Sequence, residues 1–351
     1  MAISNALQSL IQKTFKKEAK VTRISEDLRG KVIVLYGGNN LGKTHQAARL
    51  KNPIFIPCEK GMNAVNGAVV LSTRSWRDMK KHNTTLAKKE YLKLLQSGEQ
   101  ITIVIDGMER AGTYCKKYIC SRHDVTSIGK ANGGYGAWEE YDTEMWSWVD
   151  SIIGLGYTVV FIGHEKLDKK KDKYIIDGDE RCIKPIRDNA DVVCYLKSNG
   201  VDEHNKVIKS SAYIAETDEF FARTRYRYMD TFIPEFTAET LEEVIVDGIK
   251  KQNEAEGYES VSFEEQQEIY KTEDEDADIE EVKEDIKELY DRFEEMGDGK
   301  IEVYAEIVSD HLGEDVRVSE ATNKQLEALL CIRDDLESRI EEFEENDDIE
   351  E

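Results

Sequence analysis

Short, continuous apolar runs of strand length recur along the first two hundred residues. They occupy residues 32–36, 54–56, 101–105, 157–162 and 191–196. Runs without polar alternation are typical of strands buried on both faces, as in a parallel sheet that helices cover. Helical patterns separate these runs, and the clearest, at 138–153, places apolar side chains from Trp138 to Ile152 on one side. The alternation predicts an α/β core over residues 31–250, with a mostly parallel sheet between helices.

The regions on either side of this core have different patterns. Residues 1–30 include an amphipathic, lysine-rich helical pattern, which predicts a basic helix docked on the core or an arm for subunit contact. Residues 251–278 are polar and acidic, as in a flexible linker. Helical spacing returns at 279–343 and predicts a small helical domain. Residues 344–351 are almost entirely acidic and predict a disordered tail.

Charge is distributed unevenly along the chain. The 351 residues carry a net charge of −24, yet residues 251–351 hold 38 acidic and 10 basic side chains, a net of −28. Residues 1–250 are therefore mildly basic, at +4. A basic body can bind nucleic acid, whereas an acidic C-terminal region repels or competes with nucleic acid and offers a docking surface for a partner protein.

The composition also restricts the compartment. No run of 18 apolar residues occurs, and the lysine-rich beginning lacks the apolar stretch and cleavage site of a secretory signal. The six cysteines form no C-x-x-C pair, which indicates reduced thiols. These features predict a cytoplasmic protein that no membrane anchors. A zinc site at Cys115, Cys120 and His123 is disfavoured, because the spacing is unusual and no fourth ligand is clear.

A complete G-x-x-x-x-G-K-[ST] motif follows the first apolar run and opens a helical pattern, which is the context expected of a P-loop. Its residues are Gly37, Gly38, Asn39, Asn40, Leu41, Gly42, Lys43 and Thr44. In such a loop, backbone N–H groups and the helix N-terminus bind phosphates. Lys43 is predicted to contact the β- and γ-phosphates, and the Thr44 hydroxyl to ligate Mg²⁺. The motif therefore predicts a site for ATP and Mg²⁺.

Polar residues follow three of the other apolar runs. Asp106 ends the third run, where an acidic residue would complete the magnesium shell, although it also begins an ordinary Asp-Gly turn. Glu59 follows the second run and His164 the fourth. Because the carboxyl ends of parallel strands meet at one edge, Glu59 is a candidate to activate water and His164 to sense the γ-phosphate. A solvated loop carboxylate and an ordinary loop histidine remain the alternatives.

The order of these elements resembles the RecA-like recombinase core over roughly residues 31–236. That core has a P-loop, a glutamate after the next strand, an aspartate ending a third strand and a polar residue ending a fourth. Three strings are similar, more narrowly, to the short RecA-like ATPases of tailed phages, which are associated with single-strand annealing and recombination. They are Gly-Tyr-Gly at 134–136, Gly-His-Glu at 163–165 and Arg-Asp-Asn-Ala-Asp-Val-Val at 187–193. If a phage encodes the protein, its compartment is the cytoplasm of the bacterial host.

The resemblance implies roles for two of the polar residues. Glu59 matches the catalytic glutamate of the family, although Pro57-Cys58 replaces the usual acidic residue just upstream. His164 lies where bacterial recombinases carry a glutamine that reports ATP to a DNA-binding loop. Arg223 and Arg225 resemble the basic pair that recombinases offer to the ATP of a neighbouring subunit. A solvated or DNA-facing strand is at least as compatible with these arginines.

Two DNA-binding segments are also implied by the resemblance. The first, roughly 108–137, ends in a glycine-rich stretch that contains Lys130 and Tyr135. The second, roughly 165–187, contains a cluster of lysines: Lys166, Lys169, Lys170, Lys171 and Lys173. Glycine-rich mobility, an aromatic ring and clustered lysines suit a groove for single-stranded DNA. Acidic residues dilute the charge of the second segment, so a solvated charge run is the alternative.

We therefore expect an ATP-dependent, single-stranded-DNA-binding recombination or annealing protein. DNA would stimulate its ATP hydrolysis, and it would assemble as a homo-oligomeric ring or filament. Two other classes remain: a helicase-associated or loader-type P-loop ATPase, and an ATP-switched nucleic-acid-binding module with little turnover. A small-molecule kinase is disfavoured, because no acceptor pocket or lid is recognisable in the sequence.

Overall fold

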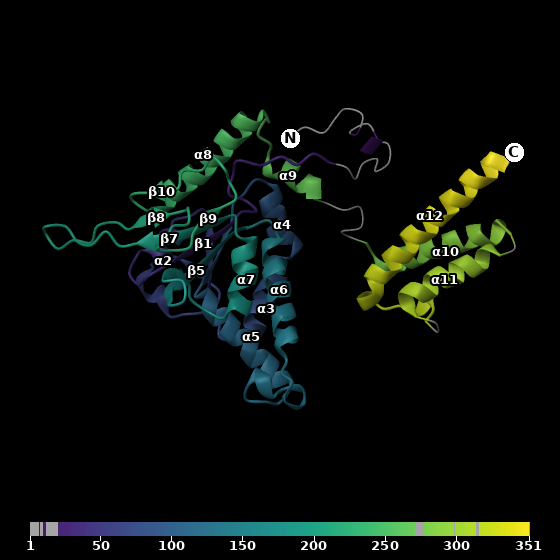
Figure 1. The fold of residues 1–351 in the computed structure, drawn as a ribbon, viewed down its shortest axis with the longest axis horizontal. Helices are drawn as coiled ribbons and strands as arrows, with labels where there is room; N and C mark the ends of the chain where they lie inside the picture. Colours follow the sequence, from purple (N-terminus) through teal and green to yellow (C-terminus); the bar gives the residue numbers. More distant parts are fainter. Residues whose placement is uncertain are drawn as a thin grey trace. The chain divides into compact units, whose positions relative to one another are not determined.

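The structure, a computed structural model, describes Leu7, Leu10, Ile11 and residues 20–270, 277–297, 299–313 and 316–350. The chain divides into two compact units, Met1–Tyr270 and Lys271–Glu351, and each is described by itself (Figure 1). Most of the predicted N-terminal basic helix lies outside the described residues, although Leu7, Leu10 and Ile11 are helical. In the described ranges, no helix combines the length and apolar character needed to cross a bilayer.

The first unit is built on one large sheet. Six strands run parallel in the order β7 (Val192–Lys197), β1 (Val32–Gly37), β5 (Thr158–Asp168), β4 (Thr102–Asp106), β2 (Pro53–Pro57) and β3 (Val69–Val70). Short antiparallel strands extend it: β6 (Lys173–Ile176) pairs with β5, β9 (Arg223–Thr224) and β8 (Ser211–Tyr213) pair with β7, and β10 (Phe232–Ile233) pairs with β8. All five predicted apolar runs are strands, and the mostly parallel sheet is confirmed.

Helices cover both faces of this sheet (Figure 1). One face packs against helices α3 (Trp76–Leu86), α5 (Met108–Arg122), α6 (Trp138–Ile153) and α7 (Glu180–Asn189). The other face packs against α2 (Lys43–Ala47) and α8 (Ala238–Glu256). Along β1, Val34 and Tyr36 face the first layer, whereas Ile33 and Leu35 face the second. Burial of successive residues on opposite faces explains why the strand sequences are apolar without alternation.

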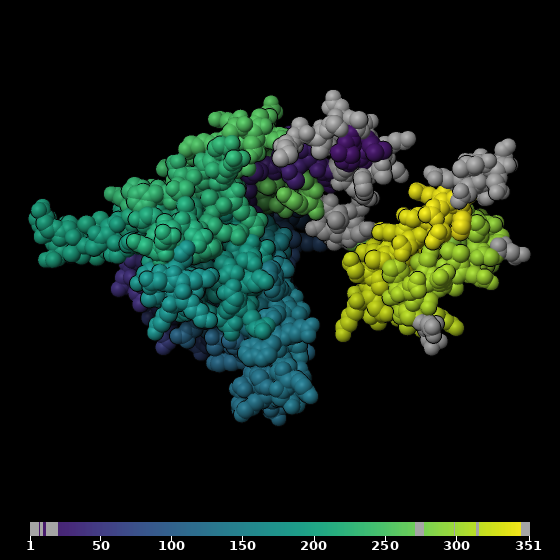
Figure 2. All heavy atoms as spheres, in the orientation of Figure 1, coloured from purple at the N-terminus to yellow at the C-terminus, as the bar shows by residue number. Residues whose placement is uncertain are grey.

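Shorter elements connect these layers. Helix α4 (Lys89–Gln96) precedes β4, and single 3₁₀ turns occur at Gly61–Ala64, Ile128–Lys130 and Asn132–Gly134. Between β7 and β8 the chain forms a hairpin that projects from the unit, bridged by Val201 and Val207 (Figures 1 and 2). Val201 is 55% exposed and Val207 74% exposed.

The prediction of an acidic linker at 251–278 is wrong for its first twenty residues. Helix α8 extends to Glu256, and α9 (Phe263–Tyr270) packs on the sheet unit. Phe263 is buried, and its ring occupies the space beside Gly30 and Gly156 where a side chain would collide with it. Glu264 forms an ion pair with Arg29. One buried aromatic ring therefore anchors a segment that is otherwise mostly polar, which is why composition alone pointed to a linker.

The second predicted DNA-binding segment, 165–187, is not an open loop. Strand β5 continues to Asp168, turns into β6 and is followed by α7. Leu167 pairs with Tyr174 across this hairpin, and the Tyr174 ring stacks on Tyr195 of β7. These contacts hold the segment against the sheet, whereas the resemblance and the lysine content predicted a DNA-binding loop, with a solvated charge run as the alternative.

The second unit is a helical bundle. Its helices are α10 (Ile279–Glu295), α11 (Lys300–Leu312) and α12 (Leu326–Glu350), with 3₁₀ turns at Val318–Glu320 and Asn323–Gln325. Ile286, Phe293, Leu329 and Leu336 lie in its core. The tail predicted as disordered differs from the structure, because α12 runs to Glu350. Glutamate favours the helical state, and extending a formed helix avoids the cost of nucleating one.

Candidate nucleotide-binding site

The P-loop joins the carboxyl end of β1 to the first turn of α2. Gly37 has φ +148°, and a Cβ atom there would lie 2.5 Å from the Leu196 carbonyl oxygen of β7. Only glycine fits this combination of backbone angle and close approach. The chain then passes through Gly42, with φ +82°, into α2. The loop is thus held by the neighbouring strand in the strand–loop–helix context that phosphate binding requires.

Lys43 is buried beneath this loop. Its Nζ donates hydrogen bonds to the carbonyl oxygens of Gly37, at 2.9 Å, and Gly38, at 2.6 Å. Burial lowers the pKa of Lys43, while Asp106 and Glu165 nearby act in the opposite direction. Phosphate oxygens would replace neutral carbonyls with anionic partners, which makes stronger hydrogen bonds to an ammonium group. Lys43 is therefore placed to contact a phosphate chain.

Thr44, in the first turn of α2, meets Asp106, the last residue of β4. The Thr44 hydroxyl donates to Asp106 Oδ2 at 3.0 Å, and Asp106 is 6% exposed. Burial raises the pKa of this carboxyl, which indicates that a cation beside it would be favourable. A hydroxyl and a carboxylate are oxygen ligands of the type that Mg²⁺ prefers. These two residues therefore fit the magnesium site predicted from the motif.

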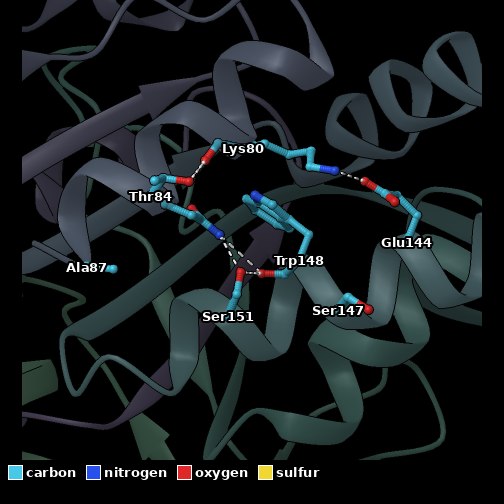
Figure 3. Close-up of a pocket in the computed structure, with 8 residues that line it drawn as sticks. Lys80, Thr84, Ala87, Glu144, Ser147, Trp148 and Ser151 are labelled. Atoms are coloured by element: carbon cyan, nitrogen blue, oxygen red, sulfur yellow. Dashed lines mark hydrogen bonds and ion pairs between the residues drawn. The ribbon is translucent and has the colours of Figure 1, made fainter. Parts of the chain in front are cut away.

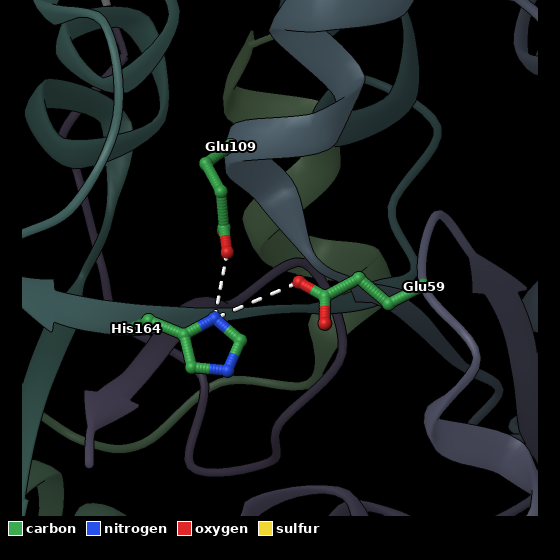
Figure 4. Close-up of side chains that lie close together, drawn as sticks. All are labelled: Glu59, Glu109 and His164. Carbon is green, nitrogen blue, oxygen red and sulfur yellow. Dashed lines mark hydrogen bonds and ion pairs between the residues drawn. The ribbon is translucent and has the colours of Figure 1, made fainter. Parts of the chain in front are cut away.

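Glu59, Glu109 and His164 form a second polar group at the same sheet edge (Figure 4). His164 Nδ1 lies 2.7 Å from Glu109 Oε1 and 3.6 Å from Glu59 Oε1. Gly107, with φ +90°, leaves room for the Glu59 side chain. A Cβ atom at position 107 would lie 2.5 Å from Glu59 Cγ, which is too close. Burial raises the pKa of Glu109. The three ligand atoms lie within 4.8 Å of one another, close enough for a divalent cation, but the Glu109 hydrogen bond already uses His164 Nδ1.

One cavity joins the two groups. It has a volume of about 610 Å³, and its lining includes the P-loop residues 39–44 together with Glu59, Asp106 and His164. The structure thus brings Lys43, Thr44, Asp106, Glu59 and His164 to one cavity, whereas Gly37 and Gly38 of the predicted P-loop are not among its lining residues. Glu109 does not line this cavity and was missed by the sequence analysis. Its position in the first turn of α5, three residues beyond Asp106, was the available signal.

A separate groove lies between α3 and α6 (Figure 3). Its volume is about 460 Å³, and its lining includes an ion pair between Lys80 and Glu144 at 2.8 Å. None of the predicted phosphate or magnesium ligands lines this groove. The cavity at the P-loop is therefore the candidate for a nucleotide.

The predicted DNA-binding residues lie in two different parts of the first unit. Lys130 and Tyr135 follow α5, a helix of 15 residues that leads about 22 Å away from the nucleotide edge. Tyr135 is 93% exposed. Lys169, Lys170 and Lys171 are exposed at the turn of the β5–β6 hairpin.

Two other lysines of this set have partners within the chain. Lys166 donates to the Gly178 carbonyl at 2.6 Å, and Lys173 pairs with Glu216 at 2.8 Å. Both arginines predicted for a subunit contact also bond internally. Arg223 donates to the Ala190 carbonyl at 3.0 Å and Arg225 to the Asp188 carbonyl at 2.7 Å, so both approach the C-terminal end of α7.

Similarity to known proteins agrees with the geometry of the P-loop cavity. A family model described as an AAA domain matches residues 29–226, more than half of the chain. The chain belongs to this family of P-loop domains, and the matched range contains the P-loop, Glu59, Asp106 and His164.

Two individual proteins are also similar. The chain is 43% identical over 324 residues to the SPbeta prophage-derived uncharacterized protein YorG of Bacillus subtilis (strain 168). The alignment covers 92% of this chain and 98% of that protein. Among solved structures, an ATPase from the type III secretion system of pathogenic bacteria is similar, and the alignment covers 90% of this chain and 86% of the ATPase chain. The identity is 11% and the TM-score 0.37, so the strand order above remains the basis for the fold.

We expect Lys43→Ala to weaken binding of Mg²⁺-ATP by roughly 10- to 100-fold, because it removes charge-assisted hydrogen bonds to phosphate worth about 1.5–3 kcal/mol. Calorimetric or fluorescent-nucleotide titration measures this change. Lys51→Ala is the matched control, since Lys51 is an exposed lysine on the same unit that pairs with Glu242. Equal affinity of Lys43→Ala and the wild-type protein would contradict the assignment of this cavity.

Proposed function

We propose that the protein is a DNA-stimulated ATPase of the single-strand annealing or recombination type. The proposal of ATP hydrolysis rests on one observation: a single cavity is lined by Lys43, Thr44, Asp106, Glu59 and His164. Phosphate contacts alone would suit a binding module, whereas hydrolysis also needs a group that activates water. Glu59 supplies a carboxylate that lines the same cavity as the P-loop.

The chain's residues divide the reaction between them. Lys43 and the P-loop N–H groups hold the phosphates, and Thr44 and Asp106 hold the magnesium ion, which when bound neutralises charge on the phosphate oxygens. Glu59 accepts a proton from the attacking water as the bond from the γ-phosphorus to the bridging oxygen breaks. His164, beside Glu59, senses the presence of the γ-phosphate. The products are ADP and inorganic phosphate.

Two surface features support single-stranded DNA as the activator. Lys169, Lys170 and Lys171 lie on a hairpin that begins at His164, so movement of His164 can reach them through one continuous strand. Tyr135 presents an exposed aromatic ring near the end of α5. Exposed rings and flexible lysines are the features that bind unpaired bases and their phosphates.

A cavity lined by the last turns of α5 and by residues 125–129 adds to this support. It has a volume of about 720 Å³, and Lys116, Lys117 and Trp138 are among its lining residues, whereas no carboxylate is. Trp138 was predicted to face the core, yet it is 39% exposed. Lys116 is paired with Asp179, so Lys117 supplies the positive charge and Trp138 the aromatic face that an anionic, base-containing ligand would meet.

A homo-oligomer is the form in which we expect this activity. Val201 and Val207 place two exposed apolar side chains on the projecting hairpin between β7 and β8, whose other residues are mostly polar, and exposed apolar side chains on a projecting element suit a contact with another protein. The similarity to a prophage-derived protein supports a phage origin and hence action in the cytoplasm of a bacterial host.

We expect Glu59→Gln to retain binding of Mg²⁺-ATP and to lose ATP turnover by about 10²-fold or more, because glutamine cannot accept the proton from water. Binding and steady-state phosphate release are measured on the same preparation. Glu90→Gln, an exposed substitution on α4, controls for the change of charge. Unchanged turnover in Glu59→Gln would place the base elsewhere.

Tyr135→Ala is expected to weaken binding of single-stranded DNA by about 1–3 kcal/mol if a base stacks on the ring. Fluorescence anisotropy with a labelled oligonucleotide measures the affinity. Tyr258→Ala is the comparison variant, since Tyr258 is also exposed, at 43%, and lies outside both predicted DNA segments. A neutral effect at Tyr135 would count against this segment as the DNA contact.

A further inference from the structure

Glu109 is a half-enclosed carboxylate that the proposed hydrolytic reaction does not use. Its side chain is 16% exposed, and its Oε2 atom has no hydrogen-bond partner among the described residues. The other oxygen, Oε1, lies 2.7 Å from His164 Nδ1. A carboxylate held this far from solvent, beside both a ring nitrogen and the Glu59 carboxylate, is an unusual arrangement for a residue with a purely structural role.

The backbone around Glu109 is shaped to admit it. A Cβ atom at Gly163 on β5 would lie 3.4 Å from Glu109 Oε2 and would collide with Met108. A Cβ at Gly178 would lie 3.3 Å from Glu109 Cβ. Gly163 on β5, and Gly178 between β6 and α7, leave room for the first turn of α5. The Glu109 carboxylate therefore reaches the residue that follows Gly163, which is His164.

The two carboxylates near His164 compete for one hydrogen. Both face Nδ1, Glu109 at 2.7 Å and Glu59 at 3.6 Å, and a ring nitrogen carries only one proton (Figure 4). Because the contact with Glu109 is the shorter one, the Nδ1–H group donates its hydrogen bond to Glu109. Glu59 is then left without this hydrogen bond, and its oxygens stay available to water in the nucleotide cavity, which Glu59 and His164 line and Glu109 does not.

We propose that Glu109 is a positioning residue for ATP hydrolysis. It accepts a hydrogen bond from His164 Nδ1 and so fixes the ring with Nε2 directed to the nucleotide cavity. It also prevents His164 from forming that hydrogen bond with Glu59. This inference rests on the proposed hydrolytic function of the cavity. A carboxylate that orients a histidine in this way acts through the ring and does not touch the reacting atoms.

Kinetics of three variants test this role. We expect Glu109→Ala to lower kcat for ATP by roughly 10- to 100-fold, as for the loss of other orienting partners, and to leave KM within about twofold. Glu109→Gln retains an acceptor for the Nδ1 proton and should stay within about threefold of the wild-type kcat, unlike Glu59→Gln. Glu139→Ala, which also removes a first-turn glutamate, is the matched control.

A double variant separates positioning from a general effect on folding. If Glu109 acts through the ring, Glu109→Ala should cost little further activity in a His164→Ala background, because coupled residues are not additive. Full loss in that background, or wild-type kcat in Glu109→Ala alone, would overturn the proposal. So would a Glu109→Gln variant as inactive as Glu59→Gln, since that outcome makes Glu109 a proton acceptor.

Proton NMR of the His164 ring provides a readout that needs no turnover. The Nδ1–H signal, assigned by its loss in His164→Gln, should persist in Glu59→Gln and in Glu109→Gln and should shift or disappear in Glu109→Ala. If the signal persists in Glu109→Ala and is lost in Glu59→Gln, then Nδ1–H donates to Glu59 and not to Glu109. That outcome would reject the inference. If the wild-type protein shows this pattern yet does not hydrolyse ATP, the proposed function fails and the positioning contact stands.

Discussion

Parallel pairing of β5 between β1 and β4 is the constraint on which the rest of the site depends. The register places Gly37 beside His164 and Asp106 beside Ile162, while Pro57 on β2 pairs with Asp106. The parallel pairing of these strands ends at one edge, so Gly37, Asp106 and His164 meet there although up to 127 positions separate them in sequence. A slip of one residue would turn each side chain to the opposite face of the sheet. The buried apolar strands thus determine where the polar residues lie.

The same edge concentrates charge that is poorly solvated. Lys43 contacts neutral carbonyls, Asp106 has the Thr44 hydroxyl as its hydrogen-bond partner, and Glu109 leaves one oxygen unpaired among the described residues. Desolvation is the largest cause of the pKa change in each, lowering that of Lys43 and raising those of Asp106 and Glu109. Such groups destabilise a fold unless a ligand of opposite charge arrives. Phosphate beside Lys43 and a divalent cation beside Asp106 would supply those charges, which links the energetic cost of the site to its expected ligands.

The sequence predicted the parts of the structure that depend on local pattern. The strands were found because residues buried on both faces must be apolar. Lys43 and Thr44 were found because the motif fixes their spacing, and Asp106 because it ends an apolar run. Glu109 was missed, since its role depends on the packing of α5 against Gly163 and Gly178 and on a histidine 55 positions away. The order of α9 and of the β5–β6 hairpin was missed for a related reason: Phe263 and Tyr174 each stabilise a polar segment by one long-range aromatic contact. The roles of the lysines, Tyr135, Arg223 and Arg225 remain predictions, because DNA and neighbouring subunits determine them.

The central claim is that this cavity hydrolyses ATP and that single-stranded DNA stimulates the reaction. The most direct test is the steady-state rate of phosphate release by the full chain with Mg²⁺-ATP, titrated with single-stranded or double-stranded DNA of the same length. The account predicts measurable turnover that rises with single-stranded DNA and rises less with the duplex. A rate that neither DNA changes, or no turnover despite tight binding of ATP, would contradict it.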